Sequence, residues 1–250
     1  DKHQRAHRKL ITEIGEALNQ DEFILHYQPR VDLATGRTVG VEALVRWEHS
    51  ERGELLPGKF LHIMAGTDEE LILGKWVLRT ALDQHTAWRA EGINLPMSIN
   101  ISPYQIQQPD FASELKTLLT KYPVGTAEQI ELEILETSAI GDLNQVVEVM
   151  NACTELGVHF SLDDFGTGYS SLSYLHKLPI HTLKIDRTFL QESNFTSNDH
   201  TIVNTIVAMA KGLHLNVVAE GVETQNQLDY LRELDCNQAQ GFLFGKPFSS

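Results

Sequence analysis

Cysteine is scarce in this chain, and long apolar runs and low-complexity stretches are missing. The two cysteines, Cys153 and Cys236, lie far apart and lack the spacing of metal ligands. Two isolated thiols predict a reducing compartment rather than a disulfide framework. No apolar run is long enough to span a bilayer, and no signal-peptide pattern is present. We therefore expect a cytoplasmic segment that makes no membrane contact of its own.

Basic residues are also few. The chain has 20 Lys and Arg residues and 34 Asp and Glu residues, which gives a formal net charge of −14. A protein that coats a nucleic-acid polymer needs clustered Lys and Arg side chains, so that function is not expected. The charge does not exclude a small anionic ligand held in a pocket by metal ions. Rossmann and Walker fingerprints are absent too, since the glycine-rich segment reads FGTGYSS without a Lys-Ser/Thr ending.

No proline- or serine-rich linker divides the 250 residues, and 42% of them are hydrophobic, which suffices for one large core. The chain begins at Asp1, and apolar residues recur at helical spacing between Leu10 and Leu18 in a charged segment. We interpret residues 1–18 as a linker helix that arrives from an upstream domain. We expect residues 19–250 to form a single domain of a larger protein. Another segment of that protein could anchor it in a membrane.

Apolar segments of strand length alternate with longer segments of helical periodicity. This alternation predicts βαβ units and a parallel sheet, and eight strands at this length favour a closed (β/α)8 barrel over an open sheet. The expected strands are Phe23–Gln28, Thr38–Arg46, Met97–Ile101, Gln129–Leu135, Val158–Leu162, Thr182–Ile185, Asn216–Ala219 and Gln238–Phe242. The expected helices are Leu71–Glu91, Phe111–Lys121, Leu143–Leu156, Tyr169–His176, His200–Gly212 and Gln225–Leu234.

The first two expected strands are joined only by the turn Asp32–Arg37, which reads DLATGR. A parallel pair needs a crossover of a dozen residues or more, so these two strands should be antiparallel. The predicted fold class is therefore α/β, a modified TIM (β/α)8 barrel whose first strand runs antiparallel to the rest.

The segment Leu162–Leu172, LDDFGTGYSSL, joins a strand end, two adjacent carboxylates and a glycine-bent loop. Asp163 and Asp164 repel each other unless a cation neutralises them, and hard divalent cations prefer oxygen ligands. This pair indicates a metal site. A solvated turn with a helix cap is the alternative explanation of an Asp pair taken alone.

Polar residues interrupt the apolar pattern near the C-terminal ends of successive strands, where catalytic groups of barrels collect. Singly, each is explained by an ordinary ion pair or a solvated edge. Together, several buried carboxylates with one lysine need cations to neutralise them. Mg²⁺ or Mn²⁺ is favoured over zinc because no Cys or His joins the set, and two such ions suit phosphodiester hydrolysis, with metal-bound enolisation as the alternative. The set is Glu42, Asn100, Glu133, Asp163, Asp164, Lys184 and Glu220.

Six sequence blocks resemble the EAL domain family, whose members hydrolyse the bacterial second messenger cyclic di-GMP. The resemblance runs from about Leu18 to Phe248, which is nearly the whole chain. The blocks are EALVRW at 42–47 with YQP ahead of it, NIS at 100–102, DDFGTGYSSL at 163–172, LKID at 183–186, AEGVET at 219–224 and QGFLFGKPF at 240–248.

The resemblance implies a cyclic-guanylate-specific phosphodiesterase that uses two Mg²⁺ or Mn²⁺ ions per site and forms linear pGpG. We expect Ca²⁺ to inhibit it, because Ca²⁺ accepts longer bonds and a looser geometry and can fill oxygen sites without aligning the water. The metal ligands it implies are Glu42, Asn100, Glu133, Asp163 and Asp164. The catalytic residues it implies are Lys184, Glu220, Glu42 and Asp164, with substrate contacts from Gln28, Leu44, Arg46, Asp186, Gln240 and Pro247. Support of the loop after the Asp pair would come from Glu136, Gly166, Thr167, Gly168 and Ser170.

The resemblance also implies partners: cyclic di-GMP, an upstream sensory or GGDEF-type domain, and a second copy that meets the helix around Tyr174 in a homodimer. The alternative function is a catalytically inactive cyclic di-GMP receptor. Two departures from the family pattern keep this alternative open. Leu135 replaces the usual threonine, and Phe60–Glu70 reads FLHIMAGTDEE where the family typically carries Ala-Glu-Glu-Thr-Gly.

Overall fold

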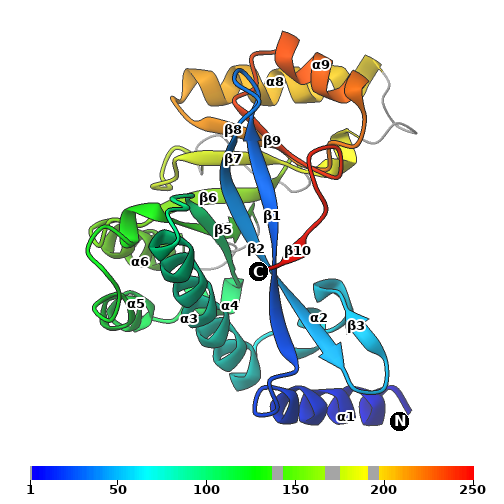
Figure 1. Ribbon diagram of the computed structural model, residues 1–250, viewed down its shortest axis with the longest axis vertical. Helices are drawn as coiled ribbons and strands as arrows, with labels where there is room; N and C mark the ends of the chain where they lie inside the picture. The colour runs from blue at the N-terminus through cyan, green and yellow to red at the C-terminus, as the bar shows by residue number, and fades with distance from the viewer. Residues whose placement is uncertain (1, 137–142, 167–174, 191–196) are drawn as a thin grey trace.

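The computed structural model describes residues 2–136, 143–166, 175–190 and 197–250. Within these ranges, eight strands close into a ring in the order β1–β2–β4–β5–β6–β7–β8–β9, since β1 pairs with both β2 and β9 (Figure 1). These strands are β1 (Phe23–Asp32), β2 (Thr38–His49), β4 (Met97–Ile101), β5 (Ile130–Leu135), β6 (His159–Phe165), β7 (Thr182–Ile185), β8 (Asn216–Ala219) and β9 (Gln238–Gln240). Two short strands extend the sheet: β3 (Gly53–Leu55) on β2 and β10 (Phe248–Ser249) on β1.

Helices lie around the outside of the ring (Figure 1). The α-helices described are α1 (Lys2–Ala17), α2 (Leu61–Met64), α3 (Asp68–Ala90), α4 (Pro103–Ile106), α5 (Phe111–Leu119), α6 (Leu143–Thr154), α8 (Ser197–Gly212) and α9 (Gln225–Glu233). The 3-10 turns among the described residues are η1 (Pro57–Lys59), η2 (Ala127–Gln129) and η4 (Arg187–Phe189), each of which lies between a strand and a helix. In the described part of the chain, none of the helices is both long and apolar enough to cross a bilayer.

Strand β1 is antiparallel to both of its neighbours in the ring, whereas every other pairing within the ring is parallel. The turn between β1 and β2 is closed by backbone hydrogen bonds from Asp32 N to Arg37 O and from Gly36 N to Asp32 O, at 2.9 and 2.8 Å. Gly36 has a φ of +69°, which glycine adopts at little cost. The predicted barrel with one antiparallel strand is confirmed.

All eight expected strands are present, and Met97–Ile101, Thr182–Ile185 and Asn216–Ala219 have the expected ends, whereas the other five are shifted. The first runs on to Asp32 and the second to His49, and the last stops at Gln240 rather than Phe242. The long β1–β2 hairpin continues past the ring toward α1 and β3 (Figure 1), and its register pairs Phe23 with Trp47. Neither β3 nor β10 was expected, because strands of two or three residues carry too little periodicity to be recognised. The expected helix Tyr169–His176 lies mostly outside the described residues, as does the dimer contact at Tyr174.

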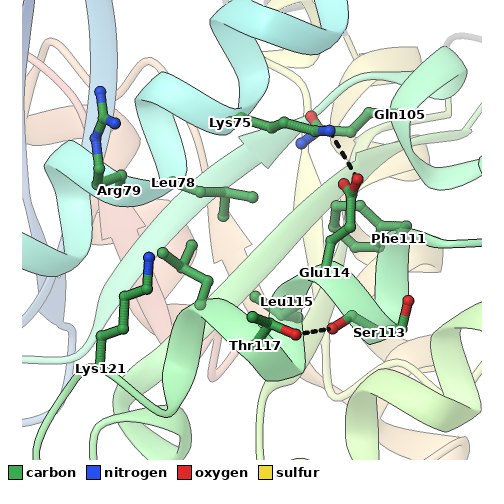
Figure 2. Close-up of a pocket in the computed structure, with 11 residues that line it drawn as sticks. Lys75, Leu78, Arg79, Gln105, Phe111, Ser113, Glu114, Leu115, Thr117 and Lys121 are labelled. Atoms are coloured by element: carbon green, nitrogen blue, oxygen red, sulfur yellow. Dashed lines mark hydrogen bonds and ion pairs between the residues drawn. The ribbon is translucent and has the colours of Figure 1, made fainter.

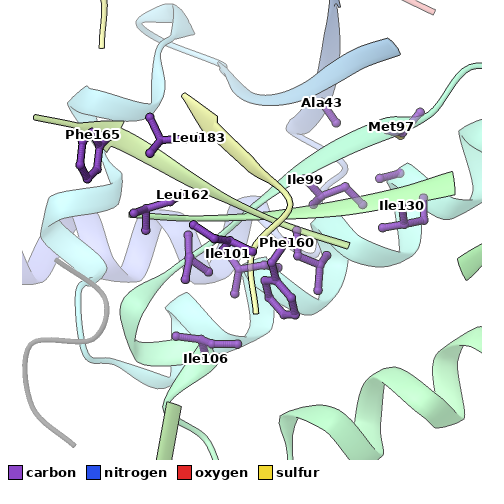
Figure 3. Close-up of a cluster of buried hydrophobic side chains, with 14 of the residues drawn as sticks. Ala43, Met97, Ile99, Ile101, Ile106, Ile130, Phe160, Leu162, Phe165 and Leu183 are labelled. Atoms are coloured by element: carbon purple, nitrogen blue, oxygen red, sulfur yellow. The ribbon is translucent and has the colours of Figure 1, made fainter. Parts of the chain in front are cut away.

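The core lies between the ring and its helices. Alternate residues of β4, β5, β6 and β7 point outward into it and are almost fully buried, and Figure 3 shows a cluster of these side chains. They are Met97, Ile99, Ile101, Ile130, Leu132, Ile134, Phe160, Leu162, Leu183 and Ile185. Because side chains alternate along a strand, the residues between them point into the ring, and those are polar.

Candidate active site

Lys184 is the buried centre of the candidate site. Its Nζ lies 2.5 Å from Glu133 Oε2 and 2.6 Å from Glu220 Oε1, and 3.5 Å from both Glu42 Oε2 and Asp163 Oδ1. Glu42, Glu133 and Asp163 come from β2, β5 and β6, Lys184 comes from β7, and Glu220 directly follows β8. The ring thus brings one cation and four carboxylates to a single point.

Two amide side chains hold Glu42 by both oxygens. Asn100 Nδ2 donates to Glu42 Oε1 at 2.7 Å, and Gln240 Nε2 donates to Glu42 Oε2 at 2.6 Å. Gln240 Nε2 also lies 3.0 Å from Gln28 Oε1, and Gln28 Nε2 donates to Gly245 O at 3.0 Å. These contacts fix the orientation of the Glu42 carboxylate before any ligand arrives.

A break in strand register lets both residues of the Asp pair face the mouth of the ring. The pairing of β6 with β7 shifts between Leu162 and Phe165, and Asp164 has a φ of +55°. Such a bulge re-aims a side chain that would otherwise point to the opposite face, and positive φ is uncommon for a residue other than glycine. As a result, carboxylate oxygens of Asp163, Asp164 and Glu220 lie within 4.8 Å of one another.

Burial and mutual repulsion perturb the acid groups of the site. Desolvation raises the pKa of Glu220 to about 8, although the charge of Lys184 opposes this shift. Desolvation, followed by the charge of Asp163, raises the pKa of Asp164 to about 6. Desolvation and the charge of Glu42 raise the pKa of Glu133 well above its usual value. Desolvation would also raise the pKa of Glu42, but Lys184, Gln240 and Asn100 together lower it. The raised pKa values show that burial and repulsion disfavour full ionisation of these carboxylates, and a further cation would offset both effects.

One carboxylate oxygen at the centre of the site lacks a hydrogen-bond partner. Glu133 Oε1 is buried and unpartnered among the described residues, although its other oxygen contacts Lys184. A buried carboxylate oxygen without a partner is costly, and a cation would satisfy it. The donors around it are carboxylates and the Asn100 amide, which suit Mg²⁺ or Mn²⁺. The residues present therefore fit the metal that the sequence predicts.

Glu136 braces the turn that follows the Asp pair. Its Oε2 accepts a hydrogen bond from Gly166 N at 3.0 Å. Gly166 has a φ of +97°, and a Cβ there would lie 2.9 Å from the Phe189 ring, so only glycine fits. Of the loop residues expected from the sequence, Glu136 and Gly166 are thus in contact. Thr167, Gly168 and Ser170 lie outside the described residues.

A cavity of about 510 Å³ adjoins the carboxylates on the side of α2 and α3. Glu42, Asn100, Asp163 and Asp164 form its polar end. Its other walls are mainly apolar and include Leu44, Leu61, Met64, Leu73, Val77 and Leu135. Both departures from the family pattern lie here, since the segment Phe60–Glu70 supplies α2 and Leu135 ends β5.

The remaining expected substrate residues lie at different depths around the mouth. Asp186 follows β7 and caps η4 by accepting a hydrogen bond from Thr188 N at 3.0 Å. Pro247 precedes β10, which pairs with β1 next to Gln28. Arg46 lies farther out on β2, where its Nη1 donates to Val45 O at 2.9 Å, and it is not among the residues that line the described cavity.

A second polar layer, not anticipated as a unit from the sequence, lies beneath the site. Arg30 Nη1 lies 2.6 Å from Glu131 Oε1, and Ser98 Oγ donates to the same oxygen at 2.9 Å. Thr182 Oγ1 donates to Glu131 Oε2 at 2.8 Å. Burial alone would raise the pKa of Glu131, but Arg30 and these hydrogen bonds lower it. Ser98, Glu131 and Thr182 each stand two residues before a residue of the site, and that spacing is the signal that could have found them.

The EAL domain family matches residues 11–247 of the chain. The chain is 39% identical over 240 residues to MucR of Pseudomonas aeruginosa, a bifunctional diguanylate cyclase/cyclic di-GMP phosphodiesterase, a match that covers 96% of this chain and 35% of MucR. It is also 39% identical over 236 residues to the cyclic di-GMP phosphodiesterase NbdA of the same organism, covering 94% and 30% of the two chains. The chain spans about a third of the length of the curated relatives it matches.

A solved structure of the PaMucR phosphodiesterase in complex with c-di-GMP superposes on the chain with a TM-score of 0.92. The two are 38% identical, and the match covers 97% of this chain and 98% of the other. The chain thus matches the family over most of its length. That length contains the alternating strands and helices, the antiparallel first strand and the carboxylates around Lys184. The chain belongs to the EAL domain family.

Proposed function

We propose that this domain is a divalent-metal-dependent phosphodiesterase that hydrolyses one ester bond of cyclic di-GMP to linear pGpG. One observation carries the proposal. In the described part of the chain, a buried lysine lies amid four carboxylates, one of which has an oxygen without a partner there, and this cluster opens onto a cavity of about 510 Å³. The similarity to MucR and NbdA, which are named cyclic di-GMP phosphodiesterases, supports the choice of substrate.

The residues that would hold two Mg²⁺ or Mn²⁺ ions are Glu42, Asn100, Glu133, Asp163 and Asp164. Ions bound there would lower the pKa of water and offset the negative charge of the phosphodiester. Gln240 and Asn100 hold the two oxygens of Glu42 in place, so little reorganisation is needed when the ions bind. The bulge at Asp164 supplies a second carboxylate from the same strand end.

Lys184 and Glu220 are the residues placed to handle the attacking water. The Lys184 ammonium has donors in a fixed, buried position and contacts Glu220 Oε1 at 2.6 Å. The Glu220 side chain is 19% exposed, so one part of it reaches the mouth. A carboxylate in that position can accept a proton from water, and Lys184 keeps it oriented. Asp186, Gln28, Leu44, Gln240 and Pro247 would contact the substrate around this point, and Arg46 would do so from farther out.

Conversion of Glu42 to alanine tests the proposal. The variant removes one expected metal ligand, the acceptor of the Asn100 amide and one of the two acceptors of the Gln240 amide. We therefore expect linear product to form at least roughly a hundredfold more slowly. The measurement is chromatography of cyclic di-GMP incubated with Mn²⁺. Glu48→Ala is the matched control, because Glu48 lies on the same strand and is exposed.

Two results would contradict the proposal. Hydrolysis by Glu42→Ala at the rate of the unaltered domain would show that the site is assigned to the wrong residues. Binding of cyclic di-GMP by the unaltered domain in Mn²⁺ without any linear product would identify the domain as a receptor rather than an enzyme.

Replacement of Mg²⁺ or Mn²⁺ by Ca²⁺ is expected to keep substrate binding and to stop hydrolysis. Ca²⁺ has the same charge but takes longer bonds and a looser geometry, so the attacking water is no longer aligned. Calorimetry in Ca²⁺ should detect cyclic di-GMP binding while chromatography detects no product. Sustained turnover in Ca²⁺, with other divalent ions removed, would refute this expectation.

A further inference from the structure

A second cavity lies between α3 and α5, on the outside of the barrel. It measures about 410 Å³, which is within the range of small-molecule sites. Figure 2 shows Leu78 of α3 and Leu115 of α5 in its centre. Both are buried, as is Phe111 at the start of α5. The cavity therefore offers an apolar floor to a ligand that enters from the surface. We call it the α3/α5 groove.

Positive charges line this groove in a domain whose net charge is −14. Among the described residues that line it, Lys75, Arg79 and Lys121 are basic and Glu114 is acidic. Lys75 Nζ lies 2.7 Å from Glu114 Oε1, so that pair is neutral. Arg79 and Lys121 lie toward the other side of the groove (Figure 2) and leave an excess of positive charge there. Charge complementarity favours an anion, and the apolar floor favours one with a hydrophobic body.

Gln105 connects this groove to the candidate active site. Gln105 is only 4% exposed, yet it lines both the α3/α5 groove and the cavity that contains Glu42 and Asn100. The amide lies flat against α3, because a Cβ on Gly74 would come within 2.4 Å of Gln105 Oε1. Gln105 is therefore the partition between the two cavities, and the glycine makes room for it.

The partition belongs to a helix that starts three residues after Asn100, a residue of the site. Asn100, which orients Glu42, lies on β4, and α4 begins at Pro103. Ser102 Oγ caps α4 by accepting a hydrogen bond from Gln105 N at 3.1 Å. A ligand that pushes on Gln105 from the groove thus acts on a wall of the active-site cavity and on the short helix that follows Asn100.

We propose that the α3/α5 groove is an effector site for a small organic anion with an apolar body, and that Gln105 transmits its occupancy to the active-site cavity. The ligand's negative charge lies by Arg79 and Lys121, while its apolar body covers Leu78 and Leu115. Occupancy displaces the Gln105 side chain toward the active-site cavity and changes the affinity for the substrate.

The binding test uses anilinonaphthalene sulfonate, a fluorescent anion with an aromatic body. The folded domain is titrated beside the double variant Arg79→Glu/Lys121→Glu and the control Lys116→Glu, which alters an exposed charge of α5 outside the groove. We expect the double variant to bind the probe at least tenfold more weakly and the control to match the unaltered domain. Equal affinity in all three proteins would overturn the proposal, because the probe would then be bound elsewhere.

The coupling test measures the affinity for cyclic di-GMP by calorimetry in Ca²⁺, with and without saturating probe. We expect a change of at least threefold in the unaltered domain and none in the double variant or in Gln105→Ala. An unchanged affinity in the unaltered domain would overturn the proposal, as would a change that persists in the double variant. Both tests measure binding alone, so they remain decisive even if the domain does not hydrolyse cyclic di-GMP.

Discussion

Replacing Lys184 with methionine is expected to lower the rate of cyclic di-GMP hydrolysis by roughly a thousandfold at saturating Mn²⁺. The reason is that its Nζ contacts Glu42, Glu133, Asp163 and Glu220 at once. Methionine has a similar length but no charge and no donors. The variant therefore loses the group that orients Glu220 and the cation that balances the carboxylates.

The same substitution at Lys116, an exposed lysine of α5, is the matched control and should leave the rate unchanged. A folded Lys184→Met domain still has its expected metal ligands, so it should bind Mn²⁺ and give a cooperative thermal transition. Hydrolysis within tenfold of the unaltered domain would remove Lys184 from the reaction. The thermal transition is measured in Mn²⁺ before the assay, which distinguishes a variant that fails to fold from a folded variant that is inactive.

Replacing Glu131 with glutamine is expected to destabilise the domain by about 3–5 kcal/mol, a fall of roughly 10 °C in the unfolding temperature. Glu131 forms a buried ion pair with Arg30 at 2.6 Å and accepts hydrogen bonds from Ser98 and Thr182. Glutamine keeps the shape but leaves the buried Arg30 guanidinium without its counter-charge. Arg30 is also confined by Gly40, where a Cβ would lie 3.0 Å from Nη2, so it cannot easily move away.

The exposed pair of Lys75 and Glu114 provides a control of similar geometry, at 2.7 Å. Glu114→Gln should cost no more than about 1 kcal/mol, because water replaces the lost partner. The double variant Arg30→Met/Glu131→Leu should recover most of the stability that Glu131→Gln loses, since it removes both buried charges together. If Glu131→Gln and Glu114→Gln unfold at the same temperature, the buried pair contributes little to stability. The second polar layer would then not be what supports the site.

The fold could be predicted because its signals are local and repeated. Most strands carry outward-facing apolar residues at every second position, as in Met97, Ile99 and Ile101, and from the second expected strand onward helical segments separate them. The turn Asp32–Arg37 is too short for a crossover, so the length of this connection alone predicts that the first strand is antiparallel to the second. The end of β2 was misjudged because the hairpin continues past the ring, where antiparallel pairing with β1 and β3, rather than burial in the barrel, maintains the strand. The missed residues of β1, 29–32, lie inside the ring and pair with β2 and β9.

Much of the candidate site could be predicted for a related reason. Parallel strands of a barrel all end at the same rim, so polar residues near their C-terminal ends must meet, and the structure brings Glu42, Asn100, Glu133, Asp163 and Lys184 together there. What periodicity could not reveal is which of the inward-facing residues belong to the site. Glu131 and Glu133 look alike in the sequence, but the structure pairs Glu131 with Arg30 and Glu133 with Lys184.

The sequence by itself determined the barrel class, the direction of its first strand and the oxygen-rich chemistry at the strand ends, since period, turn length and residue type are properties of short segments. Tertiary structure alone decided that a bulge turns Asp164 to the same side as Asp163, that Arg46 lies away from the described cavity, and that Gln105 separates two cavities. Those features depend on contacts between segments far apart in the chain, such as α3 with α4 and β6 with β7. No local pattern encodes them, because their geometry exists only when the ring has closed.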